Sequence, residues 1–173
     1  MVSFKPKGTF YRLYSWLPII ILIVSVLNEF DFNYLNLKYF SFNFSYILIF
    51  YYSLKKSDSL GYGLIFIAGL FNDVVLGTPI GISSLAYLLL CGSAAYLRNI
   101  TLRPSIIKDW IFFLLSILVI NSISFIILNF IFNYKIIYLD QVVNIIFIFI
   151  LFLLISYFFN FFEKTFLGKS NVG

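Results

Sequence analysis

The sequence predicts an all-α integral membrane protein with six transmembrane helices and both termini in the cytoplasm. Three observations lead to this fold class: the composition, the length of the apolar runs and the distribution of basic residues. Of the 173 residues, 62% are hydrophobic and 11% are charged, whereas about a quarter of a soluble domain is charged. A bilayer core accepts helices of about 20 apolar residues. Because the apolar runs are long and unbroken, helices are predicted rather than the alternating strands of a barrel.

Charged residues divide the chain into six apolar segments, which we expect to form a single transmembrane domain over residues 1–173. The first segment follows a basic stretch and lacks a small-residue cleavage site, so we interpret it as a retained span rather than a signal peptide. The second is short and carries Ser41, Asn43 and Ser45. The predicted spans are residues 13–29, 39–54, 60–76, 80–97, 110–133 and 141–162.

A tight helical hairpin is predicted between the third and fourth spans, around residues 77–81. Gly77 suits the end of the first helix, because glycine accepts a left-handed backbone. Thr78 can cap the second helix, and Pro79 fits its first turn, where the amide is free. The alternative is one continuous kinked helix over residues 60–97, which is too long for a bilayer.

Basic residues favour one set of loops. Ten of the 12 Lys and Arg residues lie before the first span or after the second, fourth and sixth spans, whereas Lys38 and Lys135 lie in the other loops. The positive-inside rule therefore places both termini in the cytoplasm. We interpret the net charge of +5 as a mark of this topology and of contact with anionic membrane lipids, and we expect no nucleic-acid partner.

The residues that common catalytic sites need are missing from the sequence. The chain has no histidine, which excludes Ser–His and Cys–His nucleophile pairs and histidine metal sites. No Gly-rich phosphate loop occurs, and the lone Cys91 is interpreted as a small buried hydrophobe. An aspartyl peptidase needs two carboxylates at one site, and only Asp73 lies within a span, since Asp140 is at a loop boundary. We therefore expect no enzyme activity, no metal and no cofactor.

Asp73 stands out because a carboxylate at membrane depth is costly and by default marks a functional site. Gly69, Asp73 and Gly77 are four residues apart and share one helix face. Such a small–polar–small stripe lets another helix approach closely and offers it a hydrogen-bonding anchor. Alternatively, Asp73 lies near the outer interface and caps or staples the hairpin. Both interpretations remain open, and they are compatible.

The third and fourth spans are richer in small residues than the last two. Close helix packing in lipid requires small residues, because apolar bulk gives no advantage there. These two spans are therefore the predicted packed centre. The fifth and sixth spans, rich in Ile, Phe and Leu, are expected to face lipid or to surround that centre.

The hairpin also carries a longer pattern, Gly-Leu-x-x-Asp-x-x-x-Gly-x-Pro-x-Gly, followed by Leu and Tyr. The residues that make it are Gly69, Asp73, Gly77, Pro79, Gly81, Leu85 and Tyr87. This pattern resembles that of the rod shape-determining protein MreD family. The remainder of the chain agrees with the family in hydropathy alone. Many relatives have a proline at the start of the second span, where this chain has Phe44-Ser45.

The resemblance implies a non-catalytic component of the bacterial machinery that builds the lateral cell wall, located in the inner membrane. Its implied partners are MreC, through the transmembrane helix of that protein, and indirectly MreB, the RodA polymerase and its transpeptidase partner. It also implies a fold similar to the substrate-binding subunits of energy-coupling-factor vitamin transporters. The leading hypothesis is a scaffold whose third and fourth spans, with Asp73, hold the fold together and receive the MreC helix.

Two other hypotheses follow from the same residues. The first is a small-molecule transport subunit with Asp73 as a ligand group. Such subunits dock their partner through small residues four apart on the first helix, and residues 16–27 contain no alanine and no such pair. The second is an intramembrane enzyme, which would require another acid beside Asp73.

Overall fold

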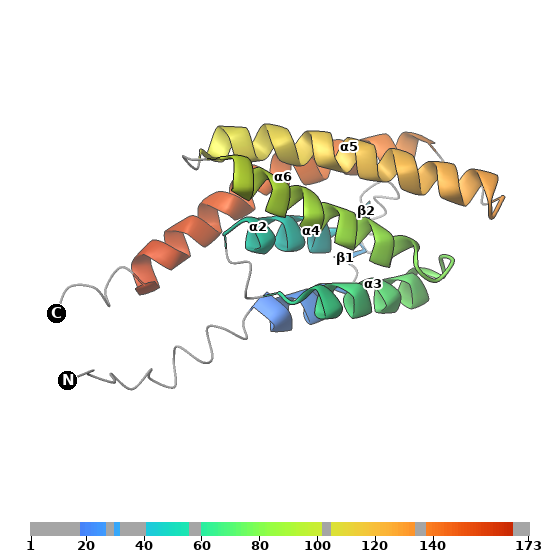
Figure 1. The fold of residues 1–173 in the computed structure, drawn as a ribbon, viewed down its shortest axis with the longest axis horizontal. Coiled ribbons are helices and arrows are strands. Elements are labelled where there is room, and N and C mark those ends of the chain that lie inside the picture. The colour runs from blue at the N-terminus through green and yellow to red at the C-terminus, as the bar shows by residue number, and fades with distance from the viewer. Residues whose placement is uncertain are drawn as a thin grey trace.

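The computed structural model describes residues 18–26, 30–31, 41–55, 60–101, 105–133 and 138–167. Within them the fold is all-helical apart from one pair of two-residue strands (Figure 1). β1 (Phe30–Asp31) pairs antiparallel with β2 (Ser41–Phe42). Residues 18–26 are helical. The other helices are α2 (Phe44–Lys55), α3 (Tyr62–Leu76), α4 (Ile82–Ile100), α5 (Ile106–Phe130) and α6 (Tyr138–Leu167).

Each predicted span overlaps one of these helical segments. α4 continues to Ile100, α5 begins at Ile106 and α6 covers Tyr138–Leu167, all beyond the predicted bounds, and the second span differs most at its start. We predicted a helix from residue 39, whereas Ser41 and Phe42 are extended and α2 begins at Phe44. The 12 residues of α2 span about 18 Å at 1.5 Å per residue, which is less than the bilayer core of about 30 Å. Pairing with β1 explains the late start, because the backbone of residues 41–42 bonds to a strand instead of a helical turn.

The centre of the described bundle is α2 rather than α3. Residues 47–50 are completely buried, and α2 packs against both α4 and α6. Its apolar residues cover the whole circumference, as is typical of a buried helix. In contrast, α3 packs against α4 and leaves side chains such as Phe66 and Val74 exposed. The prediction that the third and fourth spans form the packed centre is therefore wrong for the third, in which Gly69 meets α4 but Gly63 has nothing within 4 Å of the position that a side chain would occupy.

Aromatic side chains join α2 to the last two helices. Phe50 of α2 lies 4.9 Å from Phe113 of α5 and 5.8 Å from Phe152 of α6, measured between ring centroids. Phe113 and Phe152 are stacked at 4.2 Å. These three rings form the part of the core where α2, α5 and α6 meet.

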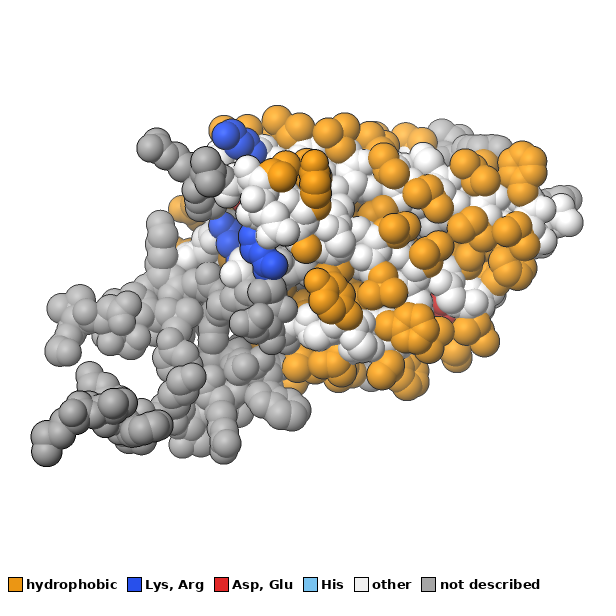
Figure 2. Space-filling model, viewed as in Figure 1, with side chains coloured by type: hydrophobic (Ala, Val, Ile, Leu, Met, Phe, Trp, Pro, Cys, Tyr) orange, Lys and Arg blue, Asp and Glu red, His pale blue; other side chains and the backbone are white. Residues whose placement is uncertain are grey.

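The surface of the described chain is strongly apolar. Two helices are long and apolar enough to cross a membrane, over Ile106–Phe130 and Gln141–Phe161, and most of their residues are not buried. Figure 2 shows hydrophobic side chains along the length of the visible face, with Lys and Arg at one end. The exposed cations of the described residues are Lys55, Arg98 and Lys108. They lie where α2 and α4 end and α5 begins, and the Arg98 guanidinium donates a hydrogen bond to the Ser53 carbonyl.

Candidate functional site

The hairpin between α3 and α4 begins with a glycine in the left-handed conformation. Gly77 follows the last residue of α3 and has φ 66° and ψ 23°. Its N–H and that of Thr78 both donate to the main-chain carbonyl of Asp73. Glycine adopts this backbone without the steric cost that a side chain would bring. The prediction that Gly77 ends the first helix is confirmed.

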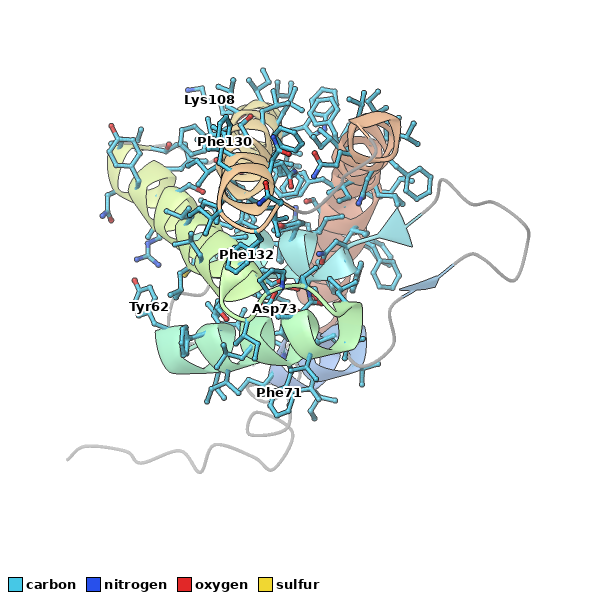
Figure 3. All side chains as sticks on the ribbon, turned by 90° about the vertical axis from the view of Figure 1, so that its right-hand side faces the viewer. Tyr62, Phe71, Asp73, Lys108, Phe130 and Phe132 are labelled. Carbon is cyan, nitrogen blue, oxygen red and sulfur yellow. The ribbon has the colours of Figure 1, made fainter. Side chains whose placement is uncertain are left out.

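The Asp73 side chain is completely buried and accepts three hydrogen bonds. Its Oδ1 accepts from the Thr78 hydroxyl at 3.0 Å and from the Ser83 N–H at 2.9 Å, and its Oδ2 accepts from the Gly81 N–H at 2.7 Å. Figure 3 places Asp73 between α3 and the turn that leads into α4. Gly81 is the N-cap residue of α4, so two free amides at that helix start are satisfied. Asp73 of α3 therefore caps α4.

This geometry corrects the predicted cap. α4 begins at Ile82 and Gly81 has φ 106°, so Pro79 lies in the turn before the helix. The Thr78 hydroxyl donates to Asp73, and no side chain of the N-cap residue bonds the helix start. The prediction that Thr78 caps α4 is therefore wrong. The physical reason is that a carboxylate accepts more strongly than a hydroxyl and has a favourable interaction with the helix dipole.

Below the turn, the backbones of α3 and α4 are in direct contact at Gly69. A Cβ atom on Gly69 would lie 2.6 Å from the Ser84 nitrogen and 2.8 Å from its Oγ, and would also overlap its Cα. The Ser84 hydroxyl donates to the Phe66 carbonyl at 3.0 Å. The Asn72 amide donates to the Ser83 hydroxyl at 3.0 Å. Glycine is therefore required at position 69, because any side chain would push the two helices apart.

The remaining predicted site residues lie elsewhere on α4. Tyr87 is completely buried, and its ring meets the edge of Tyr46 from α2 at 5.7 Å. Leu85 is 39% exposed and lies on the outside of the bundle. From the sequence, Ser83 and Ser84 had no role beyond the small-residue content of the fourth span. Their position within the first turn of α4, where polar side chains favour capping and turn contacts, was the available signal.

The chemistry of this site is structural. All three donors to Asp73 come from the hairpin itself, and the carboxylate has no exposed surface. A base or ligand group must reach its substrate, which this carboxylate does not. Among the described residues, no group of three or more Cys, Asp or Glu side chains is placed to hold a metal ion.

A separate apolar cavity of about 310 Å³ lies between the helical residues 18–26 and α3. The lining side chains recur at helical spacing along both segments and are all aliphatic or aromatic. They are Ile19, Leu22, Ile23, Val26, Leu64, Ile67, Ala68 and Phe71. Pockets for polar small molecules contain a few well-placed polar groups, and this cavity has none in its lining.

Comparison with known proteins returned no relatives. No family model matches the chain, and neither a curated protein nor a solved structure matches it. The function of the hairpin is therefore inferred from its own residues and contacts.

Proposed function

We propose that the chain is a multi-pass protein of the bacterial inner membrane that acts as a non-catalytic scaffold in the cell-wall elongation complex, as the MreD family does. The observation that carries this proposal is the hairpin. Gly69, Asp73, Gly77 and Gly81 each meet a separate physical requirement of one tight turn between two helices. These are the same positions that make the sequence resemble the family.

A membrane location is supported by the outward faces of the helices. α5 and α6 expose large apolar side chains along their length, among them Leu115, Val119 and Leu154. An apolar surface of this extent is unfavourable in water and suits hydrocarbon. We propose that all six helical segments cross or enter the bilayer, the shorter ones with local thinning of the membrane.

The proposed orientation follows from the basic residues. Lys55, Arg98 and Lys108 are exposed at one end of the bundle, whereas the α3–α4 turn lies at the other end of α4. The positive-inside rule assigns the basic end to the cytoplasm. The turn at residues 77–81 would then face the outer side of the membrane, with both termini inside.

For the partner, we propose that the transmembrane helix of MreC binds the outside of the hairpin rather than the seam between α3 and α4. The seam is occupied, because Gly69 lies against Ser84. The outside of α4 presents Leu85 and Leu89, each 39% exposed. It also presents Gly92, which has no other atoms within 4 Å of the position of a side chain, so a partner helix could approach it closely. MreB, RodA and its transpeptidase partner would be reached through MreC.

Disulfide crosslinking in membranes tests this proposal. In a Cys91→Ala background, Leu85→Cys is co-expressed with MreC variants that carry single cysteines along their transmembrane helix. Val119→Cys is the matched control, because Val119 is 58% exposed but lies on α5. We expect a crosslinked product for Leu85→Cys and little for Val119→Cys.

Two results would count against the proposal in different ways. Equal crosslinking at both positions would show that the hairpin is not the partner surface. Failure of the wild-type chain to co-purify with MreC, together with normal rod shape after its depletion, would overturn the scaffold function itself.

The transport hypothesis finds less support in these contacts. A polar vitamin would need an accessible anchor, yet Asp73 is fully engaged within the hairpin. The apolar cavity beside α3 offers no polar side chain.

A further inference from the structure

The apolar cavity beside α3 is a groove with two matching walls. On α3 the lining is made by four apolar residues spaced three or four apart, Leu64, Ile67, Ala68 and Phe71. On the facing helical segment, the lining residues from Ile19 to Val26 repeat the same spacing. Residues with this spacing lie on one face of a helix. The α3 stripe spans about 10 Å at 1.5 Å per residue, so the groove runs along the helices.

The groove has a buried floor and exposed rims. Leu22 and Val26 are each 2% exposed and Ala68 is 7% exposed, whereas Ile67 and Phe71 are 48% and 58% exposed. Figure 3 shows Phe71 on the side of α3 that faces away from α4 and α5. The groove therefore opens onto the outer surface of the described bundle. In the proposed membrane location, the medium at that surface consists of lipid acyl chains.

An apolar hollow of this size is unfavourable when it is empty, because its lining loses dispersion contacts. Its volume is about 310 Å³, and an apolar cavity of roughly 150 Å³ is already large enough to bind benzene. A partner helix fits the groove poorly, because helices in lipid associate through small residues and Ala68 is the one small residue in the lining. A single acyl chain is thin, flexible and apolar along its whole length, so it matches both walls.

One end of the groove lies at the basic end of the bundle. Leu64 is in the first turn of α3, which begins at Tyr62. Figures 1 and 2 place the start of α3 at the end of the molecule where Lys and Arg side chains are exposed. These cations include Lys55 in the last turn of α2 and Arg98 in the last turn of α4. Positive charge at the membrane surface attracts anionic headgroups.

We propose that this groove binds one acyl chain of an anionic phospholipid, whose phosphate headgroup lies at the basic end. The acyl chain fills space that the two apolar stripes leave between them, and the cations select the headgroup. The site requires the membrane location proposed above but not the scaffold function. Loss of MreC binding would therefore leave lipid binding unchanged.

Native mass spectrometry of the full chain tests this site. The protein is extracted in mild detergent from vesicles of equal parts phosphatidylglycerol and phosphatidylcholine, and the lipid that remains bound is identified. We expect one phosphatidylglycerol on each wild-type chain. Ala68→Phe places a ring on the floor and should lower this retention about tenfold, as for the exclusion of about two methylene groups. Val74→Phe is the matched control, because Val74 is on the same helix, 67% exposed and outside the lining.

A second variant keeps the test decisive if Ala68→Phe does not accumulate. Phe71→Ala removes a ring from an exposed rim, so the helix packing is expected to survive. It should lower phosphatidylglycerol retention roughly fourfold, as for lost contact with about one methylene group.

Three results would overturn the proposal. Wild-type retention of phosphatidylglycerol in both Ala68→Phe and Phe71→Ala would place the lipid outside the groove. Equal retention of phosphatidylcholine by the wild-type chain would show that the basic end does not select the headgroup. A lipid-free wild-type dimer that Ala68→Phe converts to a monomer would identify a second copy of the chain as the occupant.

Discussion

The α3–α4 hairpin and the α5–α6 pair are two neighbouring helix pairs held together by different interactions. In the hairpin, the backbones are in contact at Gly69 and a buried carboxylate joins the two helices through three hydrogen bonds. In the α5–α6 pair, large rings fill the interface. Trp110 stacks on Phe149 at 4.2 Å and 5°, and its indole N–H donates to the Phe149 carbonyl at 2.9 Å.

The difference shows where the specificity of the fold is located. Between helices in lipid, apolar bulk on its own gives little drive for association, whereas close packing and hydrogen bonds do. Exchanges of similar volume are tolerated between packed side chains, whereas the backbone contact at Gly69 leaves no space for any side chain. We therefore expect substitutions to be costly in the hairpin and tolerated between α5 and α6.

The largest effect is expected for Gly69→Leu. The new side chain would collide with the backbone of Ser84, so we expect a loss of more than about 3 kcal/mol in unfolding free energy. Gly63→Leu is the control, because Gly63 is on the same helix with nothing within 4 Å. It should be neutral or stabilising by up to about 1 kcal/mol. If Gly69→Leu and Gly63→Leu change the unfolding free energy equally in denaturation experiments, the close contact at Gly69 does not stabilise the hairpin.

Asp73→Ala should come next. The change leaves the amides of Gly81 and Ser83 without their acceptor, and we expect a loss of about 3 kcal/mol. Asp73→Asn should lose less, because the amide oxygen replaces one of the two acceptors. Asn72→Ala removes a single neutral bond to Ser83 and should cost about 1 kcal/mol. If Asn72→Ala is more destabilising than Asp73→Ala, the carboxylate is not the main polar contact of the hairpin.

Gly77 and Gly81 both have positive φ, and the stability cost of replacing each by alanine should increase with the distance of its φ from the usual left-handed region. Gly81, at φ 106°, lies outside the usual left-handed helical region, whereas Gly77, at φ 66°, lies within it. We expect Gly81→Ala to cost about 2 kcal/mol and Gly77→Ala about 1 kcal/mol. Gly92→Ala, in the interior of α4 with open space, should instead be stabilising. The reverse order in thermal unfolding would contradict the turn geometry.

The smallest effect is expected for Trp110→Phe between α5 and α6. The variant loses the hydrogen bond to the Phe149 carbonyl but can keep the stacked arrangement. Interhelical hydrogen bonds in membranes average about 0.6 kcal/mol, so we expect a loss of about that size. A loss as large as that of Asp73→Ala would mean that polar contacts stabilise the α5–α6 pair as strongly as the hairpin.

The hairpin could be predicted from the sequence because its residues interact over short distances along the chain. Gly77 ends α3 for reasons of local backbone geometry, and Asp73 was recognised as a possible staple of the turn. The cap on α4 was assigned to Thr78 because local residue preferences do not show which side chain of the preceding helix reaches the start of the next one. Gly81 has φ 106°, and the amides at the start of α4 bond to the carboxylate of the preceding helix.

The central position of α2 could not be predicted in the same way. Its 12 residues are too short for a typical span, and the sequence marked this segment only as short and as carrying Ser41, Asn43 and Ser45. Burial of α2 depends on the helices around it, which are far apart in the chain and are not encoded in local patterns. Small residues in α3 suggested a central helix, but of its two glycines only Gly69 meets α4, whereas Gly63 has open space around it.

The central claim is that Asp73 of α3 caps α4, and amide hydrogen exchange at Gly81 and Ser83 tests it most directly. In the wild-type chain both amides should be protected. In Asp73→Ala both should exchange roughly ten times faster or more, as for a local loss of about 1.4 kcal/mol, while amides in the middle of α5 keep their wild-type rates. Unchanged exchange at Gly81 and Ser83 in the variant would contradict the account.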